Sequence, residues 1–166
     1  MPKSKVKKYS LDYIIKSINK YDIEKRYFLL YLLTTGLRVR EAHYSIKHHN
    51  EVCDGKIISL NWSKGHKRAY ETFCIIHDLV DKIKVGKTTW FYYYHYNEDK
   101  LKFPLRYLRK VNFTLTSMYV NPIIAKYIQG RMLNTIDMAN YFIPMLDEFY
   151  DKYRNYWDKI IERIMS

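Results

Sequence analysis

One uninterrupted apolar segment restricts how this chain can fold. Residues 27–33 read Tyr-Phe-Leu-Leu-Tyr-Leu-Leu, and in a helix that begins near Asp22 they put apolar side chains on every face. Such a helix is stable only when other elements surround it, and the run is far too short to cross a bilayer, which takes about 20 residues. Gly36 is expected to end the helix in the left-handed conformation. The sequence therefore predicts a central helix over residues 22–35 that the rest of the chain covers.

The segments on both sides of this helix are also predicted to be mainly helical. Ser10 caps a helix whose apolar residues recur at helical spacing, and Asn121-Pro122 opens another with an N-cap followed by proline. Gly130 is expected to close that later helix. Besides the central one, helices are predicted at about 10–21, 39–46, 77–85, 105–117, 121–130 and 145–164. The aromatic segment 88–96 fits either a strand or the start of a helix.

Between residues 51 and 76 the pattern changes from helical to extended. Asp54-Gly55 is a hairpin signal, and Ser-Lys-Gly-His at 63–66 forms the next turn. Short strands are expected at 51–53, 56–62 and 69–76. We therefore predict an α+β protein, mainly helical, with a small three-stranded antiparallel sheet. Residues 1–9 are expected to be a basic arm or linker remnant, and residues 10–166 a single domain.

Basic residues exceed acidic ones by a wide margin. The chain has 29 Lys and Arg against 17 Asp and Glu, a net charge of +12. This excess suits a polyanionic partner, because each neutralised phosphate releases counterions. The 18 tyrosines, including Tyr92-Tyr93-Tyr94, are interpreted as packing residues rather than as a platform for stacked bases. Two cysteines cannot form a disulfide framework and indicate a reducing intracellular compartment.

Familiar metal and phosphate motifs are absent from the sequence. It has no glycine-rich phosphate loop, no His-Glu-x-x-His, no Cys-x-x-Cys and no paired acidic residues that would hold two magnesium ions. Cys74 and His77 have metal-ligand spacing, with Cys53 and His66 as further candidates. Buried, inert cysteines explain them better, so we predict neither a metal nor a cofactor. If the chain cuts a phosphodiester, it does so without a metal ion.

Arginines at structural junctions are the candidates for binding a phosphodiester. Their rigid fork matches phosphate, and their charge does not titrate. Arg38 stands at a helix-to-helix turn after the buried helix, and Arg106 and Arg109 lie three apart on one helical face. Arg131 comes just past a predicted helix end, and Tyr141 follows ten residues later.

With these residues the chain resembles the catalytic domain of the tyrosine recombinases, or phage-type integrases, and in particular the integrases of archaeal spindle-shaped viruses. The resemblance runs over about residues 10–150, and each segment that carries it is weak alone but informative in this order. The segments are Thr35-Gly36-Leu37-Arg38-x-x-Glu41, Ser63-Lys64-Gly65-His66-Lys67-Arg68, Leu108-Arg109-Lys110, Ile128-Gln129-Gly130-Arg131 and Asp137-Met138-Ala139-Asn140-Tyr141.

The resemblance implies a role for each segment. Tyr141 matches the nucleophile, and Arg38 and Arg109 match the arginines that hold the scissile phosphate. A lysine on the β-hairpin protonates the leaving oxygen. Lys64 is favoured by its Lys-Gly context, whereas a flexible turn could deliver Lys67 instead, and the choice between the two stays open.

The sequence departs from the family pattern wherever a histidine is usual. Arg106, Lys110 and Arg131 stand at the three histidine positions, and none of the six histidines replaces them. We expect Arg106 and Arg131 to assist at the phosphate, and the base that deprotonates the nucleophile is unassigned. A plainer interpretation of Arg38 also stays open, as a helix-capping surface residue paired with Glu41. Otherwise Glu41 is expected to give structural support.

The resemblance implies a site-specific DNA recombinase or integrase that works through a 3′-phosphotyrosine, without metal or ATP, and inserts viral DNA into a host chromosome. Its partners would be double-stranded attachment sites and further copies of itself, as a dimer or tetramer on DNA in the host cytoplasm, with no membrane. The family's N-terminal DNA-clamping domain is not matched, so residues 10–166 are expected to be a catalytic domain alone. Two alternatives are a type IB topoisomerase-like nicking-closing enzyme and a basic DNA-binding module without catalysis.

Overall fold

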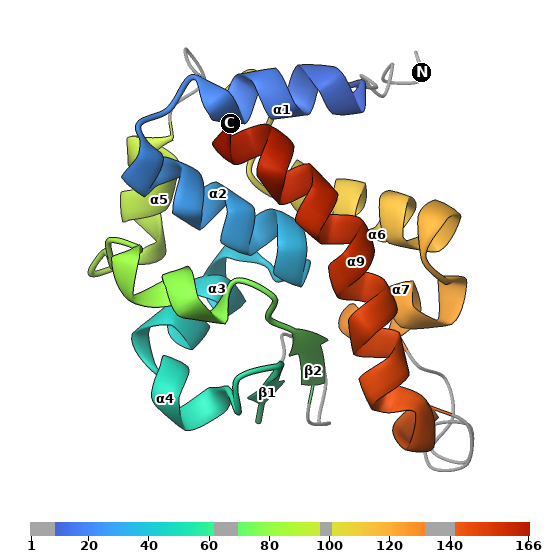
Figure 1. Cartoon of the computed structure of the whole chain (residues 1–166). Helices are drawn as coiled ribbons and strands as arrows, with labels where there is room; N and C mark the ends of the chain where they lie inside the picture. The colour runs from blue at the N-terminus through green and yellow to red at the C-terminus, as the bar shows by residue number, and fades with distance from the viewer. Residues whose placement is uncertain (1–8, 62–69, 97–100, 132–141) are drawn as a thin grey trace, which may run out of the picture.

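The computed structural model describes residues 9–61, 70–96, 101–131 and 142–166. The α-helices are α1 Leu11–Asn19, α2 Ile23–Thr35, α3 Val39–Lys47, α4 His49–Val52, α5 Thr89–His95, α6 Tyr107–Tyr119, α7 Pro122–Ile128 and α9 Leu146–Met165. The remaining elements are the strands β1 Ile57–Leu60 and β2 Tyr70–Phe73 and the 3-10 helices η1 His77–Lys82 and η3 Ile143–Met145. The architecture is mainly helical with a small antiparallel sheet (Figure 1).

The apolar run forms the central helix, as predicted. Every residue from Tyr27 to Thr35 is at most 9% exposed, and α2 contacts α1, α3, α6, α9, η1 and β2. In Figure 1, α2 lies between α1 and α3, and α9 crosses in front of it. The continuous run of apolar side chains is therefore satisfied by neighbours on all sides.

Side-chain caps define where the helices begin, as the sequence predicts. The Ser10 hydroxyl accepts a hydrogen bond from the Tyr13 N–H at 3.1 Å at the start of α1. The Asn121 side chain accepts one from the Ile123 N–H at 2.7 Å, with Pro122 as the first residue of α7. Each cap satisfies a backbone donor that has no partner inside its helix.

The predicted three-stranded sheet is wrong in its first strand within the described residues. β1 and β2 pair from Ile57–Phe73 to Leu60–Tyr70, but Glu51 belongs to α4, and only a single bridge joins Cys53 to Ile58. The Asp54 carboxylate accepts hydrogen bonds from the N–H groups of Lys56 and Ile57. Because the chain reverses direction directly after Cys53, residues 51–53 form a single bridge to β1 rather than a paired strand.

The ambiguous segment 88–96 is helical, as α5. Its tyrosines differ in burial: Tyr92 is 0% exposed, Tyr93 47% and Tyr94 86%. Tyr92 stacks on Phe28, with ring centroids 4.1 Å apart. The interpretation of all three tyrosines as packing residues is therefore correct for Tyr92 and wrong for Tyr94.

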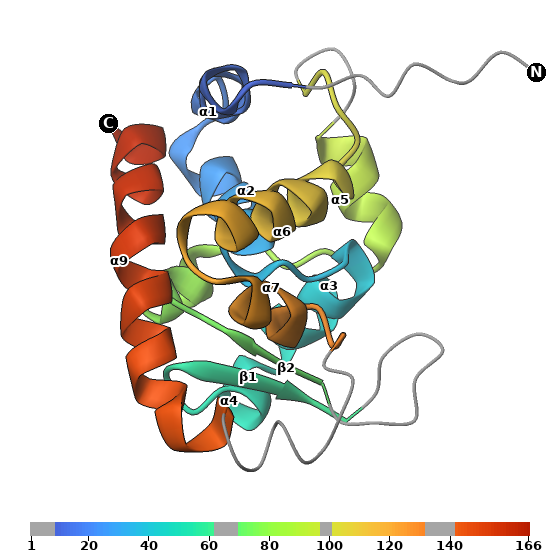
Figure 2. The same cartoon turned by 90° about the vertical axis from the view of Figure 1, so that its right-hand side faces the viewer.

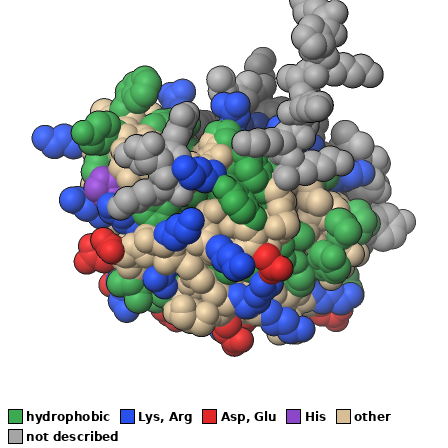
Figure 3. All heavy atoms as spheres, turned by 90° about the horizontal axis from the view of Figure 1, so that it is seen from above, with side chains coloured by type: hydrophobic (Ala, Val, Ile, Leu, Met, Phe, Trp, Pro, Cys, Tyr) green, Lys and Arg blue, Asp and Glu red, His purple; other side chains and the backbone are tan. Residues whose placement is uncertain are grey.

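The surface of the described chain is rich in basic side chains. Lys and Arg are spread over the face that Figure 3 shows, with acidic side chains more sparsely placed among them. No helix in the described ranges is both long enough and apolar enough to span a membrane.

Two buried side chains satisfy the last carbonyls of α2. Asn112 of α6 is 0% exposed and donates hydrogen bonds from its amide to the Leu33 carbonyl and to the Tyr153 hydroxyl, both at 2.7 Å. Tyr153 of α9 donates its own O–H to the Thr34 carbonyl. Because a helix leaves its last carbonyls without intrahelical partners, this network holds α2, α6 and α9 together at one point.

We expect Tyr153→Phe to lower the free energy of unfolding by about 1–3 kcal/mol, since it leaves a buried carbonyl and a buried amide N–H unpaired. The measurement is urea unfolding followed by circular dichroism. The matched control is Tyr156→Phe on the same helix, whose hydroxyl makes no hydrogen bond to a described residue and whose loss should cost less than about 0.5 kcal/mol. Equal effects of both changes would contradict the role of this network.

Candidate active site

A basic cleft opens where four segments of the chain meet. They are the start of α3, helix α5, the first half of α6 and the residues that follow α7, which lie close together in Figure 2. The cleft has a volume of about 680 Å³. It is lined by Arg38, Val39, Arg40, Tyr93, Arg106, Arg109, Lys110, Phe113, Thr114, Gln129 and Arg131.

Every charged residue in this lining is basic. Five arginines and Lys110 contribute, and the described lining includes no Asp, Glu or His. The first residues of α3, Val39 and Arg40, also face the cleft. A helix N-terminus carries the positive end of the helix dipole. Such a surface favours a bound anion, and phosphate suits arginine forks and helix N-termini best.

Arg109 of α6 is held in place by two turns that are distant in sequence. Its guanidinium donates to the Gly36 carbonyl at 2.6 Å and to the Gln129 carbonyl at 3.2 Å. In return, the Gln129 side-chain amide donates to the Arg109 carbonyl at 3.1 Å. These bonds fix the direction of the guanidinium and join the turn after α2 to the turn after α7.

Gly36, whose carbonyl accepts the Arg109 hydrogen bond, has a left-handed backbone conformation. Its φ of 69° is left-handed, a conformation that costs an L-residue roughly 1–2 kcal/mol. A Cβ at this position would also stand 3.0 Å from the Asn112 side-chain oxygen. Both facts favour glycine here, so the helix end predicted from Gly36 is confirmed.

Arg38 is the N-cap residue of α3 and is paired with Glu41. The Glu41 carboxylate, 1% exposed, accepts the Arg38 N–H at 2.9 Å and lies 3.4 Å from the Arg38 guanidinium. The Arg38 side chain remains 42% exposed and lines the cleft. Arg38 therefore caps α3 and pairs with Glu41, as the plainer interpretation expects. It also lines the cleft, as the resemblance expects.

Arg131 enters the cleft directly after a glycine-terminated helix. Gly130, with φ 67°, donates its N–H to the Tyr127 carbonyl at 3.0 Å, and the Arg131 N–H reaches the Lys126 carbonyl at 2.8 Å. This pair of bonds closes α7 in the manner typical of a C-terminal glycine. The Arg131 guanidinium carbon lies 5.2 Å from the centre of the Phe113 ring, which places its charge over α6.

The sequence model of the archaeal phage integrase family matches residues 5–159 of the chain. The chain belongs to this family. A comparison with curated proteins found no match. Membership in the archaeal phage integrase family supports an integrase or recombinase role, for which DNA is the expected partner.

The cleft of this integrase brings together the basic residues that the sequence singled out in three separate segments. Arg38, then Arg106, Arg109 and Lys110, and finally Arg131 all line it. The remaining candidates, Tyr141, Lys64 and Lys67, lie outside the described residues.

The described residues on both sides of the Tyr141 segment, Arg131 and Phe142, contact other parts of the fold. Arg131 lines the cleft. Phe142, which directly follows Tyr141, is 1% exposed, and its ring lies 4.2 Å from that of Tyr127 on α7. Both residues therefore contact α7, Arg131 through its N–H to the Lys126 carbonyl and Phe142 through the Tyr127 ring.

The cleft also contains residues whose place in it the sequence analysis did not predict, among them Arg40, Gln129 and Tyr93, the last of which was interpreted as a packing residue. Arg40 follows Arg38 by two positions at the same helix start, so the basic character of that segment was a usable signal. Gln129 matters through its bonds to Arg109, and Tyr93 through its position in the lining. For the last two the sequence carries no signal, because their roles depend on contacts between distant segments.

Proposed function

We propose that this integrase cleaves and rejoins DNA through a covalent 3′-phosphotyrosine on Tyr141. The observation that supports it best is the gathering of Arg38, Arg106, Arg109 and Arg131 in one cleft without an acidic neighbour in its described lining. A structural role alone would not require arginines from four separate positions to face the same space.

In the proposed reaction the Tyr141 oxygen attacks the scissile phosphorus, and the bond from phosphorus to the 5′-oxygen breaks. Arg38 and Arg109 hold the nonbridging oxygens, whose negative charge increases in the transition state. The departing 5′-oxygen takes its proton from Lys64 or Lys67. The 5′-hydroxyl of a partner strand reverses the attack, so the bond energy is conserved and no ATP is needed.

Arg106 and Arg131 assist at positions where the related enzymes carry histidine. Both side chains are exposed and line the cleft, so they can approach a phosphate without breaking a buried contact. Arginine keeps its charge at all working pH values. No residue is assigned as the base that takes the Tyr141 proton.

The same proposal covers the partners and the place of action. Double-stranded attachment sites would bind across the cleft, and two or four copies would assemble on paired sites to exchange strands. The product would be viral DNA joined to a host chromosome in the host cytoplasm. In this proposal residues 10–166 act as the catalytic domain, and residues 1–9 as a basic arm.

The deciding experiment traps the covalent intermediate. The protein is incubated, without added magnesium, with a nicked suicide substrate that carries a candidate attachment site, since loss of the short 5′ fragment prevents religation. We expect a denaturation-resistant protein–DNA band whose linkage maps to one tyrosine by mass spectrometry. Salt-sensitive binding without a band on any site would instead support a binding module. Relaxation of supercoiled DNA without strand exchange between paired sites would support the topoisomerase-like alternative.

A further inference from the structure

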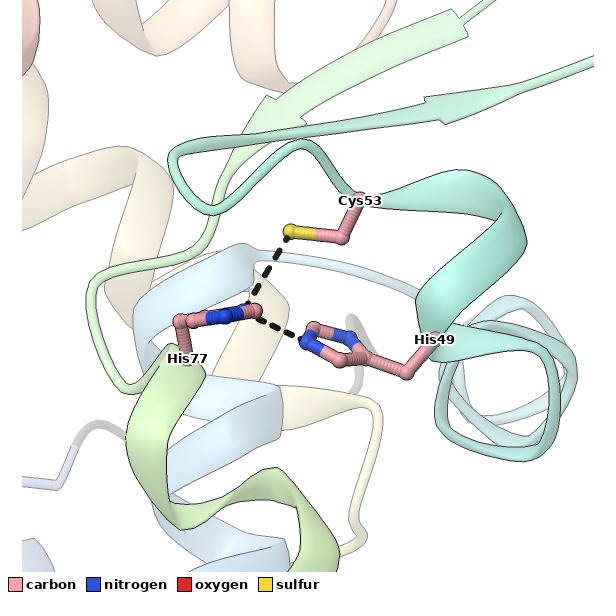
Figure 4. A group of neighbouring side chains, drawn as sticks. All are labelled: His49, Cys53 and His77. Atoms are coloured by element: carbon pink, nitrogen blue, oxygen red, sulfur yellow. Dashed lines mark hydrogen bonds between the residues drawn. The ribbon is translucent and has the colours of Figure 1, made fainter.

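A second cluster of reactive side chains lies outside the arginine cleft. His49, Cys53 and His77 point toward one another (Figure 4). The His49 Nε2 lies 2.6 Å from the His77 Nδ1, the Cys53 sulfur lies 3.9 Å from the same His77 nitrogen, and all the donor atoms are within 4.8 Å of one another. None of the three residues lines the cleft.

Local structure explains why these three side chains meet. His49 opens the short helix α4 and Cys53 follows its last residue, a spacing of four that puts both on one helical face. His77 opens η1, beyond the end of β2. The Cys74 N–H donates to the Lys56 carbonyl at 2.8 Å, so the hairpin brings η1 back to α4.

The donor set is that of a zinc site. Two imidazole nitrogens and a thiolate are ligands that Zn²⁺ takes in tetrahedral geometry, with bonds of about 2.0–2.3 Å. Such bonds place the ligand atoms ~3.3–3.7 Å apart. The two histidine nitrogens, now 2.6 Å apart, would therefore have to separate, and the Cys53 sulfur, now 3.9 Å from the His77 nitrogen, would have to approach it, each by about 1 Å or less. Acidic residues, which would favour a hard cation, take no part in this cluster.

The backbone also supports a thiolate at Cys53. The Gly55 N–H donates to the Cys53 sulfur at 3.4 Å. Zinc binds cysteine as the thiolate and histidine as the neutral imidazole, and an N–H donor beside the sulfur complements the negative charge of a thiolate.

The His49 member of the cluster borders an open hollow. This hollow has a volume of about 310 Å³ and is lined by residues of α4 and η1, among them His49. The His49 Nδ1 is buried and makes no hydrogen bond within the described residues, so the ring has a nitrogen that no described group occupies.

We propose that His49, Cys53 and His77 bind one zinc ion, with water in the fourth position. The ion would connect α4 to η1 at the base of the hairpin. Cys74, which is 0% exposed, is not part of this group of ligand side chains. The site is separate from the arginine cleft and independent of the reaction proposed there.

The test uses untagged full-length protein, freed of metal and titrated with Co²⁺ as the probe. We expect one cobalt per chain, with sulfur-to-cobalt charge-transfer absorption, displacement by Zn²⁺, and zinc-dependent protection of one cysteine from alkylation. Cys53→Ser should abolish the charge-transfer band, and His49→Gln should weaken binding by more than about a hundredfold, since even supporting residues around a ligand cost 10–100-fold.

The matched control is His95→Gln, a histidine on α5 outside the cluster, which should leave cobalt binding unchanged. If Cys53→Ser fails to fold, the stoichiometry and the charge-transfer band of the unaltered protein still decide. Absence of stoichiometric cobalt binding by the unaltered protein overturns the proposal, and so does a charge-transfer band that survives in folded Cys53→Ser. Because the covalent trapping experiment depends on the cleft, either proposal can fail without the other.

Discussion

Replacing Tyr141 with phenylalanine is expected to abolish the covalent protein–DNA complex while leaving DNA binding intact. Phenylalanine keeps the ring but has no oxygen to form the bond to phosphorus, so no residual reaction through this position is possible. The arginines that line the cleft are unchanged by this substitution, so we expect binding of the phosphate backbone to persist. The measurement pairs the suicide-substrate assay with an affinity titration on the same duplex.

A matched control for this change is Tyr94→Phe. Tyr94 is 86% exposed on α5 and does not line the cleft, so its variant should form the covalent complex at the normal rate. A band that persists in Tyr141→Phe would assign the nucleophile to another tyrosine. Loss of the band in both variants would show that general damage, rather than the missing oxygen, explains the result.

Arg109→Lys is expected to slow cleavage by about a hundredfold or more, the usual effect of removing one group that stabilises the transition state. Lysine keeps the positive charge but loses the fork. A single ammonium cannot bond the Gly36 and Gln129 carbonyls in the arginine geometry and also hold two phosphate oxygens. The rate of covalent complex formation under single-turnover conditions measures the effect.

The control for this prediction is Arg154→Lys. Arg154 pairs with Asp158 on the surface of α9, at 3.4 Å with both side chains about half exposed, and such pairs contribute little. This variant should cleave at the normal rate. Circular dichroism of both variants separates a lost phosphate contact from unfolding. Normal cleavage by folded Arg109→Lys would remove Arg109 from the proposed machinery.

The helices could be predicted from sequence because their signals are local. The Ser10 and Asn121 caps, the helix-ending Gly36 and the turn at Gly130 each act through bonds to residues at most five positions away. The apolar run that forms α2 is likewise a property of consecutive residues. Such short-range signals are present in the chain before any tertiary contact forms.

The predictions that differ from the structure depend on contacts between residues that are distant in sequence. The pattern at residues 51–53 is typical of a strand, but the turn after Asp54 leaves only the Cys53–Ile58 bridge. The sequence offered Cys74 and His77, with Cys53 and His66, as metal-ligand candidates and favoured inert cysteines, whereas the structure brings His49, 28 residues from His77, to Cys53 and His77. The spacing of four between His49 and Cys53 is a local signal, but their meeting with His77 depends on the packing of α4 against η1.

Most of the helices, the excess of positive charge and the arginines at helix ends follow from local sequence, although α4 and α5 do not. That Arg38, Arg106, Arg109 and Arg131 share one cleft, and that Arg109 reaches a carbonyl 73 residues away, depends on the packing of the folded chain. The difference lies in the range of the interactions. Caps and apolar periodicity act over a few residues, whereas a cleft is defined by side chains that meet only after distant helices have packed around α2.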